Sequence, residues 1–414
     1  MASDTTPPAG TTGIDPATQA ELDQLHAALL AARATNIGFP AATDIDVRPL
    51  VSFLDLMLNN LGDPNAEGTY PHHTKTQERE TVHFIADLLR APADDRWGYI
   101  TGGASEGTEH ALWLARRRHP RGVVYHSLAA HHCVPNAIDR LAMTAVAVRA
   151  DPHGEIDYDD LAGQVDRRRD RPAIIVANVG TAMSEAIDDV RRITHILDSL
   201  AITRRWMHAD AALSGIPLAL LDPDARPGFD FTDGADSVII SGHKFLGAPM
   251  PCGVLVVRDS QRPYAARAAT YTGAPDSTLT NSRSGLAALG LWLTLRRHGP
   301  NGLRARAEQG RDVATYAHGR LVEIGWPAHR HPHAFTVVLA TPPAAVTEKW
   351  PLASQDGRSH IVCMPGVTRE QIDAFITDLQ AANTPTVPSA AVDGHRSRGL
   401  LRRTRASADG PTVA

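Results

Sequence analysis

Residues 237–244 read Ser237-Val238-Ile239-Ile240-Ser241-Gly242-His243-Lys244. The first four form an apolar, β-branched run, which predicts a short buried strand. A lysine directly after such a strand, among Ser, Gly and His, is poorly explained as a surface charge. It is better explained as an amine in a partly desolvated pocket, where its pKa falls and it can form a Schiff base. Because pyridoxal phosphate is the cofactor that most often uses such a lysine, Lys244 predicts a pyridoxal phosphate site.

On both sides of this stretch, strand-like and helix-like segments alternate. Strands are expected at 97–101, 123–125, 145–148, 173–177, 206–208, 237–240 and 254–257. Helices are expected between them at 78–89, 105–118, 131–140, 158–168 and 188–200. This alternation predicts an α/β fold, with a mostly parallel sheet of seven strands and helices on both faces.

The chain of 414 residues is long enough for a large and a small domain. Residues 1–18 are expected to be disordered, and 19–58 to form an N-terminal helical segment with helices at 19–33 and 49–61. The large domain is expected at 59–290 and begins with a polar loop. A helix at 284–297 leads into a small α+β domain, 291–382, with helices at 307–324 and 369–379 and a strand at 335–339. The basic tail, 383–414, is expected to be disordered.

Composition narrows the class of protein. The net charge of −5 gives no reason to expect nucleic acid or an anionic membrane as a partner. Three scattered cysteines form neither a disulfide framework nor a zinc spacing, which favours a reducing compartment. No secretory signal and no run of membrane-spanning length is recognised. We therefore expect a cytoplasmic enzyme that acts on a small molecule, without nucleic acid, membrane or metal.

A loop of small residues joins the first expected strand to its helix: Thr101-Gly102-Gly103-Ala104-Ser105-Glu106-Gly107. The backbone of Gly103 and Ala104, the helix N-terminus and the Ser105 hydroxyl could together hold an anion such as a phosphate. A tight turn without a ligand explains the loop equally well. The spacing matches neither the dinucleotide-binding nor the Walker A pattern.

Further residues that suit pyridoxal phosphate follow other strands. Asp210 could face the pyridine nitrogen, and Ala212 is small enough to pack against the ring. Ser241 could contact the phosphate, His243 could do likewise or orient the lysine, and His131 could stack on the ring. Alone, the aspartate is better explained as a turn cap, and the histidine as a core or cap residue. Their order, each at the end of a strand, favours a single cofactor site.

With these residues the chain resembles the group II pyridoxal-phosphate-dependent amino-acid decarboxylases, and most of all their branch of bacterial histidine and plant serine decarboxylases. The resemblance runs from about residue 59 to about residue 295, with a weaker likeness to about residue 379. Its most specific stretches are residues 154–161, 178–181, 186–189, 208–215, 241–244 and 251–253. It implies fold type I, a homodimer with active sites at the interface, a dimer contact within 19–58, and decarboxylation of histidine, serine or another small or branched amino acid.

The resemblance also implies residue roles. Lys244 would carry the cofactor, Asp210 would pair with its pyridine nitrogen and His131 would cover its ring. The phosphate would be held by Gly103, Ala104, Ser105, Ser241 and His243.

Four further residues are implied around the substrate. Thr181 would reach the ring hydroxyl or the substrate carboxylate, and Tyr70 and His73 would form part of the substrate pocket. Tyr271, on a loop that reaches the neighbouring subunit, would protonate the carbanion. The pocket loop, Tyr70-Pro71-His72-His73-Thr74, fits neither subgroup closely, so the substrate stays open.

Several other functions are compatible with parts of the sequence. An aminotransferase would clamp the substrate carboxylate with an arginine, for which Arg283 is the candidate. A desulfurase would need a reactive cysteine, but Cys363 lies in an apolar run that indicates core. A decarboxylation-dependent aldehyde synthase and a scaffold without activity are also open. A metal site at His329, His331 and His333 is disfavoured, because Arg330 and Pro332 interrupt the pattern.

Overall fold

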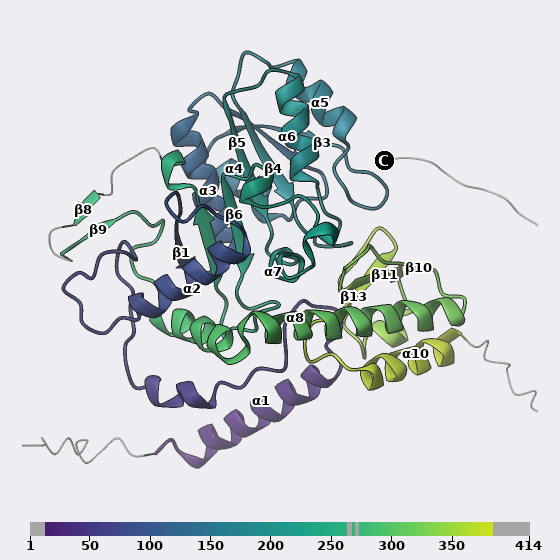
Figure 1. Ribbon diagram of the computed structural model, residues 1–414. Coiled ribbons are helices and arrows are strands. Elements are labelled where there is room, and N and C mark those ends of the chain that lie inside the picture. Colours follow the sequence, from purple (N-terminus) through teal and green to yellow (C-terminus); the bar gives the residue numbers. More distant parts are fainter. Residues whose placement is uncertain (1–12, 263–266, 270–272, 384–414) are drawn as a thin grey trace, which may run out of the picture.

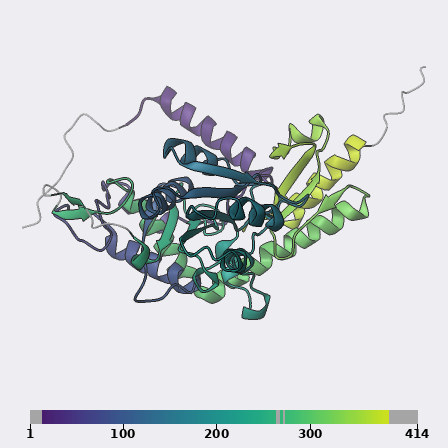
Figure 2. The same ribbon diagram turned by 90° about the horizontal axis from the view of Figure 1, so that it is seen from above.

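The structure is a computed structural model that describes residues 13–262, 267–269 and 273–383 (Figure 1). Its centre is a seven-stranded sheet between two layers of helices. A long helix, α8 (Gly285–Glu323), runs from beneath this sheet to a smaller sheet at one end of the molecule. Figure 2 shows the small sheet and α10 (Arg369–Asn383) together on one side.

The central sheet has the strand order β1-β7-β6-β5-β4-β2-β3. The strands are β1 (Trp97–Thr101), β2 (Val123–Ser127), β3 (Thr144–Val148), β4 (Ala173–Asn178), β5 (Arg205–Asp210), β6 (Ser237–Ser241) and β7 (Gly253–Val257). Strand β7 is antiparallel to both neighbours, whereas the pairings from β3 to β6 are parallel. The prediction of a mostly parallel, seven-stranded sheet is therefore confirmed.

Helices bury both faces of this sheet. On one face lie α3 (Ala104–Arg118) and α4 (Cys133–Arg140), which share a core with alternate strand residues such as Ile174. On the other lie α2 (Lys75–Leu88), α5 (Tyr158–Asp166), α6 (Val190–Ser199), α7 (Gly215–Ala219) and the first part of α8. Strands β4, β6 and β7 are buried along their whole length, which explains why they read as apolar runs, whereas the edge strand β3 is mostly exposed.

The small sheet is antiparallel throughout, in the order β10-β11-β13-β12. Its strands are β10 (Ala328–His329), β11 (Thr336–Ala340), β12 (Ser354–Gln355) and β13 (Arg358–Val362). The second half of α8, the short α9 (Ala344–Thr347) and α10 share its core, which includes Val313, Trp350 and Phe375. This unit is the small α+β part that the sequence predicts.

Helix α8 joins the two sheets across a break. The sequence predicts two separate helices here, and the structure agrees, because α8 consists of two helices that meet at a kink at Gly299 (φ 57°, ψ −175°). This left-handed backbone favours glycine, and the following Pro300 cannot donate a hydrogen bond to the preceding turn. The first helix therefore ends at this kink, and the second begins beyond it.

The N-terminal segment departs from the prediction. Helix α1 (Pro16–Ala34) begins within the stretch expected to be disordered, of which residues 1–12 lie outside the described residues. The helix predicted at 49–61 is wrong, because only a short 3-10 helix, η1 (Arg48–Phe53), forms. Val51, Leu54 and Met57 are exposed, so among the described residues there is no core that would stabilise a longer helix.

The remaining elements are short. They are η2 (Pro223–Ala225), η3 (Phe231–Asp233), η4 (Asp259–Gln261) and the strands β8 (Arg267–Ala269) and β9 (Ala274–Asp276), which pair with each other. No helix in the described part of the chain has the length and apolar character needed to cross a membrane.

Candidate active site

The candidate residues gather at the edge of the central sheet where its parallel strands end. Asp210 is the last residue of β5 and pairs in register with Asn178 of β4 and Ile239 of β6. Ser241 ends β6, and its N–H donates to the carbonyl oxygen of Ala212 at 3.2 Å. Open α/β sheets bind ligands at this edge.

Lys244 and Asp210 share one partly desolvated site. Lys244 lies three residues beyond β6 and is half-buried. Burial lowers the pKa of its amine, against the opposing charge of the Asp210 carboxylate. Asp210 is 8% exposed, and its Oδ1 accepts a hydrogen bond from the N–H of Ala212 at 3.3 Å. The structure therefore brings an amine of reduced basicity next to a buried carboxylate.

The other two lysines of the chain are placed elsewhere. Lys75 is buried, and its Nζ donates to the carbonyl oxygen of Ala66 at 2.5 Å. Lys349 is exposed and forms an ion pair with Asp378 at 2.7 Å. Lys244 is therefore the lysine at the ligand-binding edge of the sheet.

His131 lies just before α4 and is half-buried. Its Nδ1 accepts a hydrogen bond from the N–H of Cys133 at 3.2 Å, so the neutral ring carries its proton on Nε2. Burial, together with the charges of His132 and Lys244, lowers its pKa to about 4. The imidazole is therefore neutral at pH 7 and has one N–H to donate.

The loop of small residues leads directly into α3. The helix begins at Ala104, directly after Gly103, and Ser105 is exposed in its first turn. A Cβ on Gly253 of β7 would lie 2.9 Å from the nitrogen of Ala104, so this glycine permits the loop to pack closely on the sheet. The first N–H groups of a 15-residue helix are thus available for an anion.

Ser241 and His243 lie on the other side of β7. Ser241 is buried at 3% exposure and pairs in register with Gly253. The Nδ1 of His243 is 3.2 Å from the nitrogen and 3.1 Å from the oxygen of Cys252. Because the Cys252 backbone holds Nδ1, the nitrogen that can face a ligand is Nε2.

Thr181 lies in the loop after β4 and is 2% exposed. Its Oγ1 is 2.9 Å from the hydroxyl of Ser184 and accepts a hydrogen bond from the N–H of Ala186 at 3.0 Å. Thr181 and His131 both line a cavity of about 570 Å³. The cavity also reaches His153, which lies before α5, and Arg358 of β13 in the small sheet. This volume is in the range of small-molecule sites.

Tyr70 and His73 make their described contacts within the N-terminal loop. The Tyr70 hydroxyl donates to the carbonyl oxygen of Met57 at 2.7 Å, and His73 Nε2 is 3.2 Å from the Glu67 carboxylate. These contacts do not bring either residue to Lys244 of the same chain. Tyr271 lies outside the described residues, so its role stays a prediction.

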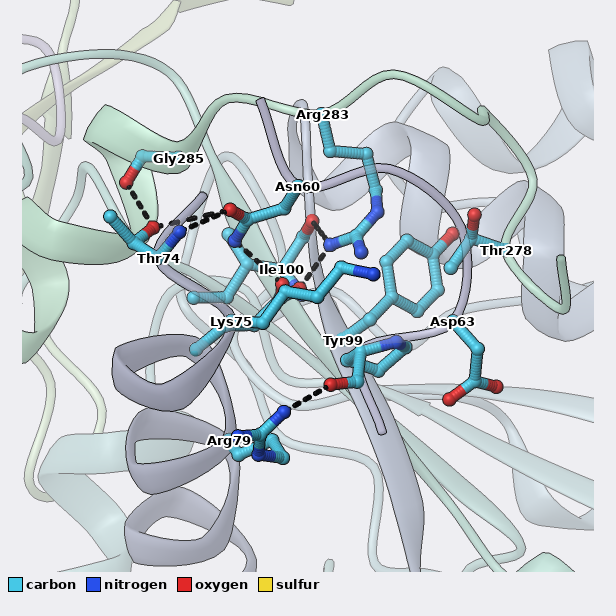
Figure 3. Close-up of polar contacts among 12 residues, drawn as sticks. Asn60, Asp63, Thr74, Lys75, Arg79, Tyr99, Ile100, Thr278, Arg283 and Gly285 are labelled. Carbon is cyan, nitrogen blue, oxygen red and sulfur yellow. Dashed lines mark hydrogen bonds and ion pairs between the residues drawn. The ribbon is translucent and has the colours of Figure 1, made fainter. Parts of the chain in front are cut away.

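Arg283, the candidate clamp of an aminotransferase, lies in a buried polar cluster (Figure 3). It forms an ion pair with Glu78 and donates to the carbonyl oxygens of Gly62 at 2.8 Å and Ile100 at 3.3 Å. Glu78 also accepts from Asn60 Nδ2 at 2.8 Å. Because its guanidinium makes these internal contacts, Arg283 is not free to bind a substrate carboxylate.

Two residues near Lys244 were missed by the sequence analysis. Cys133, in the first turn of α4, has its pKa raised to about 11 by burial and by Asp210, so it remains a thiol. Its position directly after two histidines, one of them a candidate site residue, could have indicated that it lies near the site. The Glu185 carboxylate also acts on Lys244 and is 2% exposed. Nothing in its local sequence indicated burial.

Cys363 and three histidines are the candidates for two further alternatives, a desulfurase and a metal site. Cys363 is fully buried in the small-sheet core, and burial raises its pKa to about 12, which is unlike a reactive thiolate. His329, His331 and His333 do not share a strand face, because β10 ends at His329. Among residues 13–383, where described, no group of three or more His, Cys, Asp or Glu side chains could hold a metal ion.

The donor set suits pyridoxal phosphate. Lys244 supplies an amine of lowered pKa and Asp210 a buried carboxylate beside it, while His131 supplies a neutral imidazole. The N-terminus of α3 can accept a phosphate. These groups match the aldehyde, pyridine nitrogen, ring and phosphate of the cofactor in turn.

Comparisons with known proteins agree with this chemistry. Residues 68–325 match the family model described as the pyridoxal-dependent decarboxylase conserved domain. The chain is 40% identical over 370 residues to a histidine decarboxylase of Mesorhizobium japonicum, covering 89% of this chain and 100% of that protein. It is 36% identical to a histidine decarboxylase of Pseudomonas entomophila, covering 89% and 92%.

Solved structures show the same fold. L-methionine decarboxylase from Streptomyces sp. 590, complexed with L-methionine methyl ester, matches with a TM-score of 0.82 at 26% identity, covering 90% of this chain and 96% of that chain. Glutamate decarboxylase of Lactobacillus brevis matches with a TM-score of 0.74, covering 91% and 94%. At 20% identity this second likeness concerns the fold alone.

Proposed function

Because the chain belongs to the pyridoxal-dependent decarboxylase family, we propose that the amino acid it decarboxylates is histidine, with histamine and CO2 as products. Pyridoxal-phosphate-dependent decarboxylation of an amino acid is the activity of this family. The observation that carries the choice of histidine is the 40% identity to a histidine decarboxylase over that protein's whole length.

In this proposal, Lys244 holds the cofactor through its ε-amine, and burial favours the neutral amine needed for that bond. Asp210 accepts a hydrogen bond from the pyridine nitrogen. Gly103, Ala104 and Ser105 hold the phosphate together with Ser241 and His243. When bound, the cofactor accepts the electron pair that the departing CO2 leaves on the substrate Cα.

His131 acts as a neutral hydrogen-bond donor in the proposed site. Its Nδ1 is occupied by the N–H of Cys133, so its Nε2–H is directed by the backbone at the start of α4. With a pKa of about 4, the ring does not add a positive charge that would stabilise the substrate carboxylate before CO2 leaves.

We further propose a homodimer whose interface includes the N-terminal segment. Helix α1 buries no residue within its own chain, and Leu22, Leu25 and Leu29 lie on one face with 49–60% exposure. Exposed apolar side chains continue through η1 at Val51 and Leu54. An apolar surface of this kind favours a protein partner, and we propose a second copy of this chain as that partner.

A product assay tests the substrate assignment. The purified protein, supplied with pyridoxal phosphate, is incubated separately with histidine, methionine and serine, and amine and CO2 are measured by mass spectrometry. Equimolar histamine and CO2 are expected, and Lys244→Ala is the inactive control. Amine from methionine or serine instead would refute histidine while keeping the reaction class. An aldehyde in place of the amine would indicate a decarboxylation-dependent aldehyde synthase.

A further inference from the structure

Glu185 has an unusual conformation for a buried charged residue. It lies in the loop between β4 and α6 with φ 58°, a left-handed backbone that is unfavourable for a residue other than glycine. Its Oε1 accepts a hydrogen bond from Ser214 Oγ at 2.8 Å. Its Oε2 accepts from the N–H of Phe335 at 2.9 Å and from the N–H and Oγ1 of Thr336 at 2.8 and 2.6 Å.

These partners belong to elements that adjoin the candidate active site. Ser214 follows Asp210 by four residues and directly precedes α7. Thr336 is the first residue of β11 in the small sheet. The Phe335 ring stacks on that of Phe245 at 6.0 Å between centroids, and Phe245 directly follows Lys244. One carboxylate thus joins the small sheet to the strand end that carries Asp210.

Glu185 also closes the loop that carries Thr181. Its N–H donates to the carbonyl oxygen of Thr181 at 2.8 Å. The N–H groups of Gly180 and Thr181 both donate to the carbonyl oxygen of Ala186 at 3.0 Å. A change in the backbone of Glu185 would therefore displace Thr181.

We propose that Glu185 is a positioning residue for decarboxylation, which fastens the Thr181 loop and the small sheet onto the edge that carries Lys244 and Asp210. The proposal rests on the proposed placement of Thr181 and Lys244 at the cofactor. The action of the Glu185 carboxylate on the Lys244 amine agrees with this proximity.

Three variants separate positioning from charge and from backbone strain. Glu185→Gln keeps the shape, because its amide oxygen can accept the three donors at Phe335 and Thr336 while its NH2 donates to the Ser214 oxygen. Glu185→Gly suits the left-handed backbone but loses all four side-chain contacts. The matched control is Asp356→Gly, since Asp356 has φ 50° and is exposed.

Two measurements are made, both at temperatures well below the unfolding of each variant. In the holoenzyme, Glu185→Gly is expected to lower kcat by up to about 100-fold through misplacement of the reacting groups, with a smaller change in KM. In the apoprotein, amide hydrogen exchange is expected to speed up at residues 180–186 and 335–340. Glu185→Gln should stay close to the unchanged protein in both, as should Asp356→Gly.

Wild-type kcat and KM in a folded Glu185→Gly, with only a lower unfolding temperature, would overturn the proposal. A Glu185→Gln as impaired as Glu185→Gly would also overturn it, because charge would then matter and not position. If Glu185→Gly does not fold, Thr336→Val is measured in its place. This variant removes one hydrogen bond to Glu185. The same changes in kcat and in hydrogen exchange are then expected, but smaller. The exchange measurement needs no substrate, so failure of histidine as substrate is distinguished from failure of this inference.

Discussion

Among single residues, Lys244 has an amine whose pKa is shifted in opposite directions by burial and by nearby negative charge. Burial in the site lowers the pKa of its amine, and the Asp210 carboxylate raises it. The net lowering increases the fraction of neutral amine, which is the form that bonds to an aldehyde. The neighbouring thiol of Cys133 and the neutral ring of His131 add no positive charge at neutral pH. The site is therefore tuned by desolvation, with the carboxylates of Asp210 and, more weakly, Glu185 as counter-charges.

The first prediction concerns the pKa of the Lys244 amine. Asp210→Asn removes the charge that raises the pKa of Lys244, so the pKa should fall further and neutral amine should be present at lower pH. The rate at which the apoprotein binds pyridoxal phosphate, measured against pH, should therefore move its midpoint to lower pH. Turnover should drop by more than about a hundredfold. Asp224→Asn, an exposed carboxylate on η2, is the control. An unmoved or raised midpoint would contradict the account.

The second prediction concerns His131. Because burial lowers its pKa to about 4 from an ordinary 6.5, the ring should stay neutral as the pH falls through 6 and become charged only near 4. Nitrogen NMR of the histidines in the apoprotein should show this midpoint and a proton on Nε2. A midpoint near 6.5, or a proton on Nδ1, would show that His131 is not held as described.

At the level of elements, the start of α3 depends on a close approach to β7. Gly253→Ala would place a Cβ 3.0 Å from the Gly103 carbon and 2.9 Å from the Ala104 nitrogen, both backbone atoms that cannot move freely. We predict a cost of about 1–3 kcal/mol in the free energy of unfolding and weaker binding of the cofactor, measured by denaturation and by titration.

A helix glycine without such neighbours provides the comparison. Gly319 of α8 is exposed, and a Cβ there meets nothing within 4 Å, so Gly319→Ala should be neutral or stabilising by up to about 1 kcal/mol. Equal cofactor affinity in Gly253→Ala and Gly319→Ala would show that the loop at Gly103 does not hold the phosphate.

The strands and helices also show what the sequence could predict. The central strands are apolar runs buried on both faces, so their pattern was readable, and each was located to within two residues. The helix expected at 49–61 failed because most of its apolar side chains, such as Val51, Leu54 and Met57, are exposed. The ion pair of Arg283 with Glu78 could not be foreseen, since it joins residues 205 positions apart. The residues at the end of a strand can be located from the local sequence. The members of a buried polar cluster come from distant parts of the chain and become neighbours only in the complete fold.

For the whole molecule, the exposed apolar face of α1 is the feature that a single chain does not explain. Leu25→Glu with Leu29→Glu should weaken the proposed homodimer, because it places two charges on that face. Sedimentation or light scattering should then show a shift toward monomer, accompanied by loss of activity that recovers at high protein concentration.

Ala27→Glu with Ala31→Glu is the matched control for charge. Both alanines are exposed on the opposite side of α1, so this pair should leave the assembly unchanged. Equal assembly in both double variants would indicate that α1 is not part of an interface.

The role of Lys244 can be tested directly, because the chain has three lysines. Reduction of the holoenzyme with borohydride fixes any lysine-bound pyridoxal phosphate, and peptide mass spectrometry then locates it. The account predicts a single phosphopyridoxyl group on Lys244, and none on Lys75 or Lys349. Modification of either of those lysines instead, or none on Lys244, would contradict it.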